Sequence, residues 1–457
     1  MAPINYSTLE KLMGSIETGK DDRDKLGHVR TPTHIVDEIL NNMPPQLFED
    51  PNLKWCDVGA GLGNLSVGVY LRLIKNKKMK QLFPDKKKRK AHILNNMLYL
   101  VEINDSFCKN LKKMFATSSI IQKDFLTEDI TKDIGGQPDV IISNPPYSVT
   151  VNGKKGRNGV IVWYKFVERS FQIVKKNGYL AFITPPVWRN PLNKISENII
   201  HRHLLTLRMI TVRDSRKFFE GSRMKVDWYI MKNTVKPTRK PKIFFINDDH
   251  QTGTIVNVRK NNGTDHPFPM YPNFGWNLCT KLYALSQKYG NLKVILVSTH
   301  HKSTKKIYSE KKNVADGYIY PIVTKLNRHG LEIKYSNKKH KYIGTPKIII
   351  SASESNYPYY DEKGELGTSH VQYLIPLMAE SKKQRDQDAQ KIIDFLNSDI
   401  IRFYLEALRM VIFMTSNLTF AYVPDPLQVP NPIMDYLSKE DLQEVKDTLS
   451  TFSKYRN

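Results

Sequence analysis

The stretch from Val140 to Tyr147 limits the folds open to this chain more than any other segment, and it reads Val-Ile-Ile-Ser-Asn-Pro-Pro-Tyr. An apolar run that ends abruptly in a polar residue and two prolines predicts a buried strand followed by a turn. Proline fixes φ and donates no backbone N–H, so the turn is rigid and its carbonyls remain free to accept hydrogen bonds. Ligands of open α/β sheets bind outside the carboxyl ends of the strands. We therefore expect a ligand site at Asn144.

A planar ring that carries an amino group fits this turn. The side-chain oxygen of Asn144 and the carbonyl of Pro145 can each accept one N–H of the amine, and Tyr147 can stack on the ring. Drawing both hydrogens into acceptors moves the nitrogen lone pair out of conjugation, which makes a weak nucleophile reactive. The alternative is an ordinary strand-to-loop turn, because short motifs often occur without function.

A glycine-rich turn lies between Leu53 and Val67, where a short strand, a Gly-x-Gly-x-Gly turn and a helix are predicted. Its glycines allow the backbone to approach a ligand closely. The spacing differs from the G-x-G-x-x-G pattern of dinucleotide sites. With Asp57 at the end of the strand, it favours a nucleoside-type cofactor with little or no phosphate.

Two further predicted strands, within residues 97–104 and 120–126, end in the acids Glu102 and Asp124. A carboxylate at such a position commonly binds ribose hydroxyls, and Asp124 is a candidate acceptor for the amino group of a cofactor adenine. Residues 75–90 hold nine Lys and Arg and a single acid, and they separate Glu102 from the glycines. We interpret them as a solvated insertion; contact with a phosphate backbone is the alternative.

Residues 27–40 predict a helix that Thr31 caps and that begins with Pro32. This is either an ordinary capped helix or a helix N-terminus that binds a carboxylate through its free N–H groups. A charged helical lead-in is expected before it, at residues 5–26.

The segment after the Asn-Pro-Pro-Tyr turn predicts a loop, a helix and two strands, at residues 151–158, 163–174, 179–186 and 225–231. Phe218 and Phe219 precede the last of these strands. An aromatic pair is a core element by default, but Phe219 is also a candidate for closing the other side of a ring pocket.

A basic, proline-containing linker at residues 232–242 places a domain boundary near residue 240. The elements expected beyond it are a hairpin of residues 243–246 and 254–258, a helix at 275–288, a strand at 346–351, a turn at 357–364 and a long helix at 392–409.

The glycine loop, Glu102, Asp124 and the Asn-Pro-Pro-Tyr turn, in this order on alternating strands and helices, resemble the S-adenosylmethionine-dependent adenine-specific DNA methyltransferases. The Thr-Pro segment before the glycine loop and the long C-terminal remainder resemble their gamma class, the TaqI-like type II modification methylases. The resemblance covers residues 27–231 and, more weakly, the rest. It implies an α/β, Rossmann-like catalytic domain with a mixed, mostly parallel sheet at residues 1–240. A C-terminal α+β target-recognition domain is implied at residues 241–457.

The resemblance also implies site residues. Cofactor binding is implied for Thr31, Pro32, Asp57, Gly59, Gly61, Gly63, Glu102 and Asp124. The site of the target amine is implied for Asn144, Pro145, Tyr147 and Phe219. Two departures from the family pattern are the long insertion before Glu102 and the long connection from Phe219 to Lys225, which leaves Phe218 as the alternative aromatic.

The implied reaction is transfer of a methyl group from S-adenosylmethionine to the 6-amino group of an adenine. A duplex hides that amine, so the base has to be flipped out at a cost of a few kcal/mol. Neither a metal nor a covalent nucleophile is needed. A modification enzyme of a restriction-modification or phage-defence system, with a separate restriction endonuclease as a further partner, is the expected setting.

The net charge of +25 agrees with a polyanionic partner such as double-stranded DNA. Residues 291–350 alone hold thirteen Lys and Arg against three acids, with five interleaved tyrosines. Three cysteines without a C-x-x-C pair indicate neither a zinc ribbon nor a disulfide framework. No apolar run approaches the ~20 residues of a membrane helix, and a cytoplasmic monomer is expected.

Other functions remain open from the sequence alone. RNA and protein glutamine are alternative substrates, since a basic face does not separate RNA from DNA and a glutamine amide is also a planar amine. Cytosine methylation would more often place Ser where Asn144 stands. A nucleic-acid-binding protein that retains the fold without activity is the alternative of another class.

Overall fold

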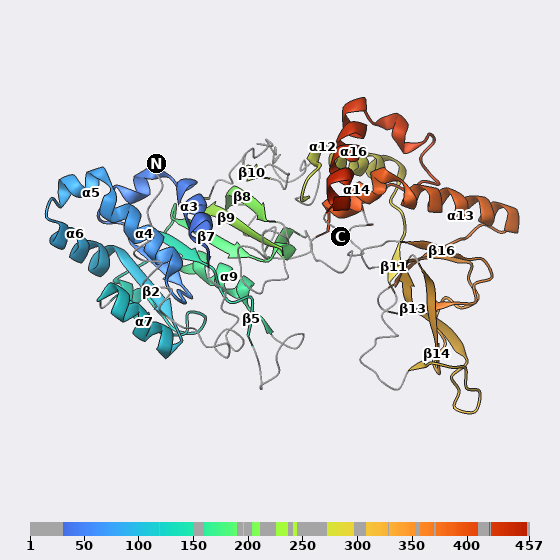
Figure 1. Cartoon of the computed structure of the whole chain (residues 1–457), viewed down its shortest axis with the longest axis horizontal. Helices are drawn as coiled ribbons and strands as arrows, with labels where there is room; N and C mark the ends of the chain where they lie inside the picture. Colours follow the sequence, from blue (N-terminus) through green and yellow to red (C-terminus); the bar gives the residue numbers. More distant parts are fainter. Residues whose placement is uncertain are drawn as a thin grey trace. The chain divides into compact units, whose positions relative to one another are not determined.

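The computed structural model forms two units, residues 1–265 and 266–457 (Figure 1). The residues that the structure describes are 31–117, 119–149, 160–189, 195, 203–210, 225–235, 241–244, 272–296, 308–327, 329–351, 357–369, 372–409, 420 and 422–454. The boundary expected near residue 240 falls too early, because the strand β10 (Lys242–Phe244) pairs with a strand of the first unit. The 5–26 lead-in, the 151–158 loop and both Phe218 and Phe219 lie outside the described residues.

The first unit is built on an eight-stranded sheet with the order β10-β8-β9-β7-β4-β1-β2-β3 in its described residues. The remaining strand bounds are β1 (Trp55–Val58), β2 (Leu98–Glu102), β3 (Ile120–Gln122), β4 (Val140–Ser143), β7 (Tyr179–Thr184), β8 (Leu204–Ile210) and β9 (Val226–Lys232). Only β9 runs against its neighbours, and the other described pairs are parallel. The expected mixed, mostly parallel sheet is confirmed.

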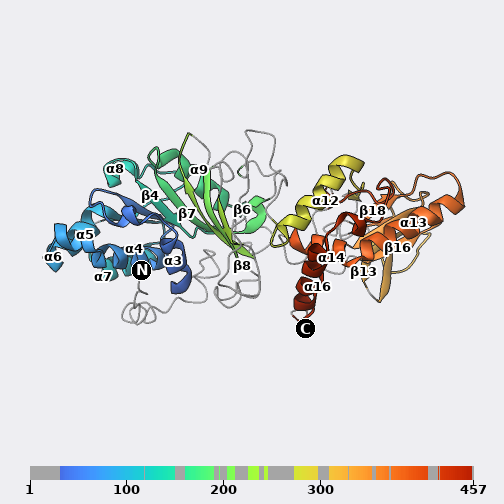
Figure 2. The same ribbon diagram turned by 90° about the horizontal axis from the view of Figure 1, so that it is seen from above.

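The central strand β4 is buried along its whole length, and so is β1. Strands that are covered on both faces read as continuous apolar runs, which explains why the sequence of β4 lacks alternation. Figure 2 shows the covering layers: α3, α4 and α7 lie on one side of the sheet, and α8 and α9 on the other. Their bounds are α3 (Thr33–Asn41), α4 (Asn64–Lys75), α7 (Asp105–Phe115), α8 (Thr131–Ile134) and α9 (Trp163–Ile173).

The basic segment between α4 and β2 is helical. It forms α5 (Lys77–Leu82), α6 (Lys86–His92) and a short π-helix, Ile93–Met97. The sequence predicts a solvated insertion here, and in the structure this insertion consists of helices.

In its described residues the second unit contains two four-stranded sheets and several helices, so its α+β class is confirmed. One sheet has the order β11-β18-β15-β16 and the other β12-β14-β13-β17. The strands are β11 (Ile295–Leu296), β12 (Tyr308–Ser309), β13 (Tyr320–Asn327), β14 (Gly330–Ser336), β15 (Lys347–Ser351), β16 (Pro358–Asp361), β17 (Gly367–Thr368) and β18 (Gln372–Pro376). The helices are α12 (Trp276–Tyr289), α13 (Lys382–Asn397), α14 (Asp399–Ala407) and α16 (Lys439–Lys454).

Three expectations in the second half need correction. The single helix at 392–409 is two helices, because Ser398 has an extended backbone (ψ 148°) and its hydroxyl caps α14. The turn expected at 357–364 contains the strand β16. Residues 242–244 pair in parallel with β8, and the second strand of the expected hairpin lies outside the described residues.

Candidate active site and nucleic-acid face

The carboxyl ends of β1, β2 and β4 meet at one edge of the sheet, because β1 pairs in parallel with both neighbours. Val58 lies opposite Val101 in β2, and Asp57 lies opposite Ile142 in β4. The segments that follow these three strands therefore leave the sheet at nearly the same position along the strand direction. This register brings the glycine loop, Glu102 and Asn144 together, although they are far apart in the sequence.

The glycine loop is tied to the end of β2 by its own backbone. The N–H groups of Gly59 and Ala60 both donate to the Val101 carbonyl, at 2.9 and 3.0 Å. Gly61, Gly63 and Gly59 all have positive φ, a conformation that side chains rarely adopt. At Gly63 a Cβ atom would also lie 2.7 Å from Cδ2 of Leu111. The loop therefore requires glycine at this position.

Glu102 is buried, and its two carboxylate oxygens bond to the glycine loop and to the segment that follows β2. Oε2 accepts the Gly61 N–H at 2.8 Å, and Oε1 accepts the Asn104 N–H at 2.9 Å. Burial raises the pKa of Glu102, and these backbone N–H donors act in the opposite direction. Each oxygen retains a lone pair, so the carboxylate can still accept the hydroxyls of a ribose.

Asp57 is 1% exposed and joins β1 to the start of α4. Its Oδ2 accepts the Ser66 hydroxyl at 2.7 Å and the Ser66 N–H at 3.2 Å. Its Oδ1 is buried and accepts no hydrogen bond from the described residues. Burial raises the pKa of Asp57 to about 7, against the lowering effect of the Ser66 bonds. A buried acceptor without a donor is costly, which fits a place where a ligand supplies the donor.

The substitution Asp57→Asn is expected to flatten the pH dependence of folding stability. The folded-state pKa of Asp57, about 7, lies above its ordinary value of 3.8, so the unfolded chain releases this proton first as the pH rises. The free energy of unfolding should therefore fall between pH 5 and 7 in the wild type relative to Asp57→Asn, by up to about 1.4 kcal/mol per pH unit. Urea unfolding across this range measures the difference, and parallel profiles would contradict the assignment.

Asn144 is held by the segment before α3. Its Nδ2 donates to Oγ1 of Thr31 at 3.0 Å, and its Oδ1 accepts the Tyr147 hydroxyl at 3.4 Å. The Thr31 carbonyl in turn accepts Nδ2 of Asn64, the first residue of α4, at 2.8 Å. Three segments that the sequence analysis singled out separately thus form one hydrogen-bonded group. The bond to Thr31 fixes the amide, with Nδ2 facing Thr31 and Oδ1 facing Tyr147.

The role expected for Thr31 as a helix cap is wrong. The helix α3 begins at Thr33, Pro32 occupies its N-cap position, and no side chain caps it. Since Pro32 has extended backbone (φ −64°, ψ 149°), Thr31 lies one residue further from the helix than expected. Its buried hydroxyl is used by Asn144 instead. Pro32 lies at the start of α3, next to this contact.

Asp124 follows β3, and its carboxylate serves its own turn. Oδ1 accepts the Leu126 N–H at 2.9 Å, and Oδ2 accepts the Thr127 hydroxyl at 2.8 Å. These bonds reach neither the glycine loop nor Glu102, so among the described residues Asp124 stands apart from the group around Asn144. Phe219 lies outside the described residues.

Apolar side chains near the carboxyl edge were missed by the sequence analysis. Ile103 directly follows Glu102 and is 59% exposed, unlike the buried strand before it. Phe125 and Phe166 stack with ring centroids 5.3 Å apart, and a Cβ at Gly59 would lie 3.4 Å from Cε1 of Phe166. Ile103 could have been found from the sequence, because it is an apolar residue directly after the acid that ends a predicted strand.

The described residues contain no group of three or more His, Cys, Asp or Glu side chains that would hold a metal ion. None of their helices is both long enough and apolar enough to cross a membrane. Their cysteines, Cys56, Cys108 and Cys279, are buried and free.

The second unit carries a basic surface around β13, β14 and the loop that leads to β15. The exposed lysines described between residues 291 and 350 are Lys293, Lys311, Lys312, Lys325, Lys338, Lys339 and Lys341. Two lysines counted in this basic region serve the fold instead. Lys334 pairs with Glu310 at 2.5 Å, and Lys347 is fully buried.

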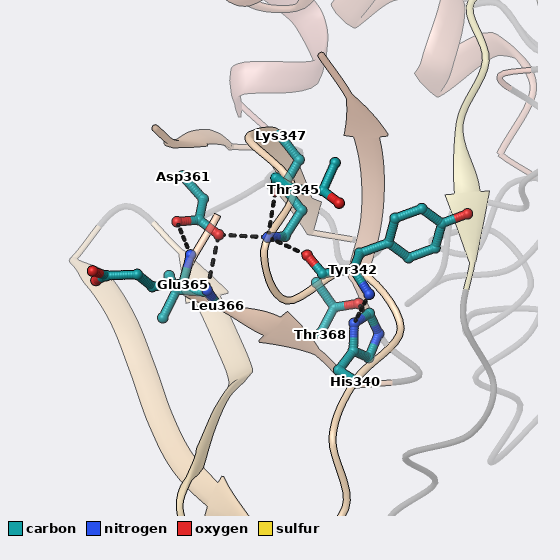
Figure 3. Close-up of polar contacts among 8 residues, drawn as sticks. All are labelled: His340, Tyr342, Thr345, Lys347, Asp361, Glu365, Leu366 and Thr368. Atoms are coloured by element: carbon teal, nitrogen blue, oxygen red, sulfur yellow. Dashed lines mark hydrogen bonds and ion pairs between the residues drawn. The ribbon is translucent and has the colours of Figure 1, made fainter. Parts of the chain in front are cut away.

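Lys347 anchors the loop that carries three of the exposed lysines (Figure 3). Its Nζ donates to the carbonyls of Tyr342 and Thr345, at 3.0 and 3.1 Å, and to Oδ2 of Asp361 at 2.6 Å. The Asp361 carboxylate also accepts two backbone N–H groups, from Glu365 at 3.0 Å and Leu366 at 2.9 Å. Removing one partner of such a buried pair leaves an uncompensated charge, so Lys347 and Asp361 stabilise the loop together.

His340 supports the same loop from within (Figure 3). It is buried, its Nδ1 accepts the Tyr342 N–H at 3.3 Å, and its Nε2 lies 3.3 Å from the Thr368 hydroxyl. Its neighbours Lys338, Lys339 and Lys341 are exposed. The buried histidine anchors the loop, and the three exposed lysines beside it form a basic surface.

Comparison with known proteins gives a family for part of the chain and a fold for nearly all of it. Residues 56–219 match the family of the Eco57I restriction-modification methylase. No curated protein matches the chain. The type IIL restriction-modification enzyme MmeI in complex with DNA has a TM-score of 0.56 at 10% identity, over 92% of this chain and 71% of that chain. The DrdV–DNA complex has a TM-score of 0.55 at 11% identity, over 94% of this chain and 59% of that chain.

The matched segment contains Asp57, the glycines, Glu102, Asp124 and Asn144, so the resemblance to restriction-modification methylases is confirmed for residues 56–219. At 10% and 11% identity, the likeness to the two solved structures concerns the fold. The chain spans about three fifths of the DrdV chain, at 59%.

Proposed function

We propose, from the premise that residues 56–219 form a restriction-modification methylase segment, that this protein is a site-specific DNA adenine methyltransferase. It transfers a methyl group from S-adenosylmethionine to the 6-amino group of an adenine flipped out of duplex DNA. Its setting is the modification activity of a restriction-modification or phage-defence system. The observation that carries the proposal is the group in which Thr31 fixes the Asn144 amide beside the glycine loop.

The residues at the carboxyl edge fit a nucleoside cofactor. Glu102 offers two oxygens to the ribose hydroxyls, and the exposed side chain of Ile103 offers an apolar contact to the adenine. Asp57 has an unused buried oxygen for a ligand donor. When bound, S-adenosylmethionine supplies a methyl group that its sulfonium has already activated. The chain therefore has to bind, orient and polarise, which leaves no role for a covalent nucleophile.

The target amine is polarised by two acceptors in this proposal. Asn144 Oδ1 and the Pro145 carbonyl accept its two hydrogens, which directs the nitrogen lone pair at the methyl group. The bond from Asn144 Nδ2 to Thr31 prevents the amide from turning its N–H groups toward the amine. Tyr147 provides an aromatic face, and stacking returns ~1–3 kcal/mol of the cost of flipping the base. Phe219 is our choice for the opposite face.

The 6-amino group of adenine is favoured over other amines by two features. Asn, rather than Ser, stands at position 144, which favours adenine over cytosine. The basic second unit, with its anchored lysine loop, supports a nucleic acid rather than a protein glutamine as the substrate.

Replacing Lys338, Lys339 and Lys341 with Ala should weaken DNA binding and flatten its dependence on salt. If each lysine contacts one phosphate, the slope of log K against log salt should fall in magnitude by about 2 to 3. The matched control changes Lys383, Lys391 and Lys446, three exposed lysines on α13 and α16 of the same unit. Fluorescence anisotropy at several salt concentrations measures both. An unchanged slope in the loop variant would remove this loop from the interface.

The function itself is tested by offering labelled S-adenosylmethionine with unmethylated DNA, RNA or a protein extract. We expect the label in DNA. Label in RNA or protein only would overturn the substrate, and cofactor binding without transfer to any of the three would favour a silent binding protein.

A further inference from the structure

The basic insertion of the first unit is an ordered pair of helices, and each helix has its own cap. Oδ1 of Asn76 accepts the N–H groups of Lys78 and Met79 at the start of α5, at 2.8 and 3.2 Å. Oδ1 of Asp85 accepts the Lys88 N–H at the start of α6, at 2.7 Å. Such caps satisfy backbone donors that a short helix otherwise exposes.

Arg89 fastens these helices to the body of the unit. It is 6% exposed, its Nε donates to the Ile74 carbonyl at 3.1 Å, and its Nη1 donates to the Phe83 carbonyl at 2.6 Å. Met79 is fully buried, and the His92 ring stacks on Phe83 at 4.3 Å. The segment is therefore a built surface with its own small core.

The other basic residues of this segment point outward without compensation. The exposed lysines are Lys75, Lys77, Lys78, Lys80, Lys86, Lys87, Lys88 and Lys90. None of them forms an ion pair with a described residue, and the single acid of the segment, Asp85, caps a helix. Like charges on neighbouring turns repel one another. Because an ordered scaffold keeps eight such charges together, the segment favours a polyanionic partner.

The helices lie at the end of the sheet opposite the candidate active site. α4 begins at Asn64, which bonds to Thr31 at that site, and ends at Lys75, where the basic segment starts. Twelve helical residues span about 18 Å. The chain then re-enters the sheet at Leu98, opposite Trp55, at the amino end of β1. In Figure 1, α5 and α6 accordingly lie away from β5 (Ser148–Val149), which follows the Asn-Pro-Pro-Tyr turn.

We propose that α5 and α6 form a second binding surface for duplex DNA, which holds the phosphate backbone of a segment other than the one that enters the active site. A straight duplex at Asn144 does not pass the opposite end of the sheet, so the bound segment is a second molecule or a distant part of the same one. The inference rests on the proposed function in one respect, since the first of the two duplexes is the one that enters the active site.

The test is the number of short DNA duplexes that one full-length protein binds, measured by sedimentation at saturating DNA. The variant replaces Lys86, Lys87, Lys88 and Lys90 with Gln. The matched control replaces Lys112, Lys113, Lys132 and Lys176, four exposed lysines elsewhere in the same unit. We expect two duplexes per wild-type and control protein and one per variant. Donor- and acceptor-labelled duplexes should also show energy transfer in the first two proteins alone.

One duplex per wild-type protein would overturn the proposal, and so would two duplexes on the variant or an equal loss in the control. Short duplex RNA that displaces the second DNA more effectively than DNA itself would also overturn it, in favour of an RNA partner. Circular dichroism and cofactor calorimetry check that the variant is folded. Methyl transfer is recorded on the same samples, so a failure of the proposed activity is seen separately from the number of bound duplexes.

Discussion

Asn144→Ala should lower the rate of methyl transfer to DNA by about 10²- to 10³-fold or more, as expected when one preorganised polar group of an active site is removed. The amine would lose its main acceptor, and its lone pair would stay in conjugation with the ring. Cofactor affinity should change little, because Glu102 and the glycine loop hold each other through their own hydrogen bonds. Single-turnover transfer of labelled methyl and calorimetry with S-adenosylmethionine measure the two effects.

Thr31 supplies the control for this prediction. Thr31→Ser keeps the hydroxyl that accepts Asn144 Nδ2 and should retain most of the activity, whereas Thr31→Val removes it and should lower turnover without abolishing it. Near-normal turnover in Asn144→Ala would contradict the mechanism. Equal losses in Thr31→Ser and Thr31→Val would show that the hydroxyl does not position the amide.

Glu102→Ala should weaken cofactor binding by about 100-fold, since ~1.5–3 kcal/mol is typical of a hydrogen bond to a charged group and more than one such bond is lost. The substitution removes the acceptor for any ribose hydroxyl and also leaves the Gly61 and Asn104 N–H groups without their partner. Calorimetry with S-adenosylmethionine measures the affinity.

Glu102→Gln separates the two causes. Its amide oxygen can replace one of the two acceptors, but its amino group opposes the second backbone N–H, so an intermediate affinity is expected. Wild-type affinity in Glu102→Ala would exclude this carboxylate from the cofactor site. A thermal unfolding curve confirms that the loss is not caused by an unfolded domain.

The central part of the fold could be predicted because its strands are buried on both faces. β1, β2 and β4 read as mostly apolar runs with Asp57, Glu102 and Asn144 at or next to their carboxyl ends, and parallel strands place such ends at one edge. The sequence could not show that β8 and β10 complete the sheet, since nothing local signals that β9 runs antiparallel between β7 and β8.

The roles of individual side chains were harder to predict than the regions of the fold in which they lie. The pattern Thr-Pro before an apolar helix is typical of a cap, but in the structure the Thr31 hydroxyl bonds to Asn144, a residue that the sequence places far away. Lys347 was counted in a basic face, yet it is buried against Asp361. Both outcomes depend on tertiary contacts, which local composition does not encode.

The central claim is that Asn144 and Pro145 receive the 6-amino group of an adenine, and the identity of the modified nucleoside tests it most directly. Methylated DNA from the labelling reaction is digested to nucleosides, which are separated and identified by mass. We expect the label in N6-methyl-2′-deoxyadenosine with the wild-type protein, and no label there with Asn144→Ala. Label in a methylated cytosine would contradict the assignment of the base, and 6-methyladenine formed equally well by Asn144→Ala would contradict the assignment of the site.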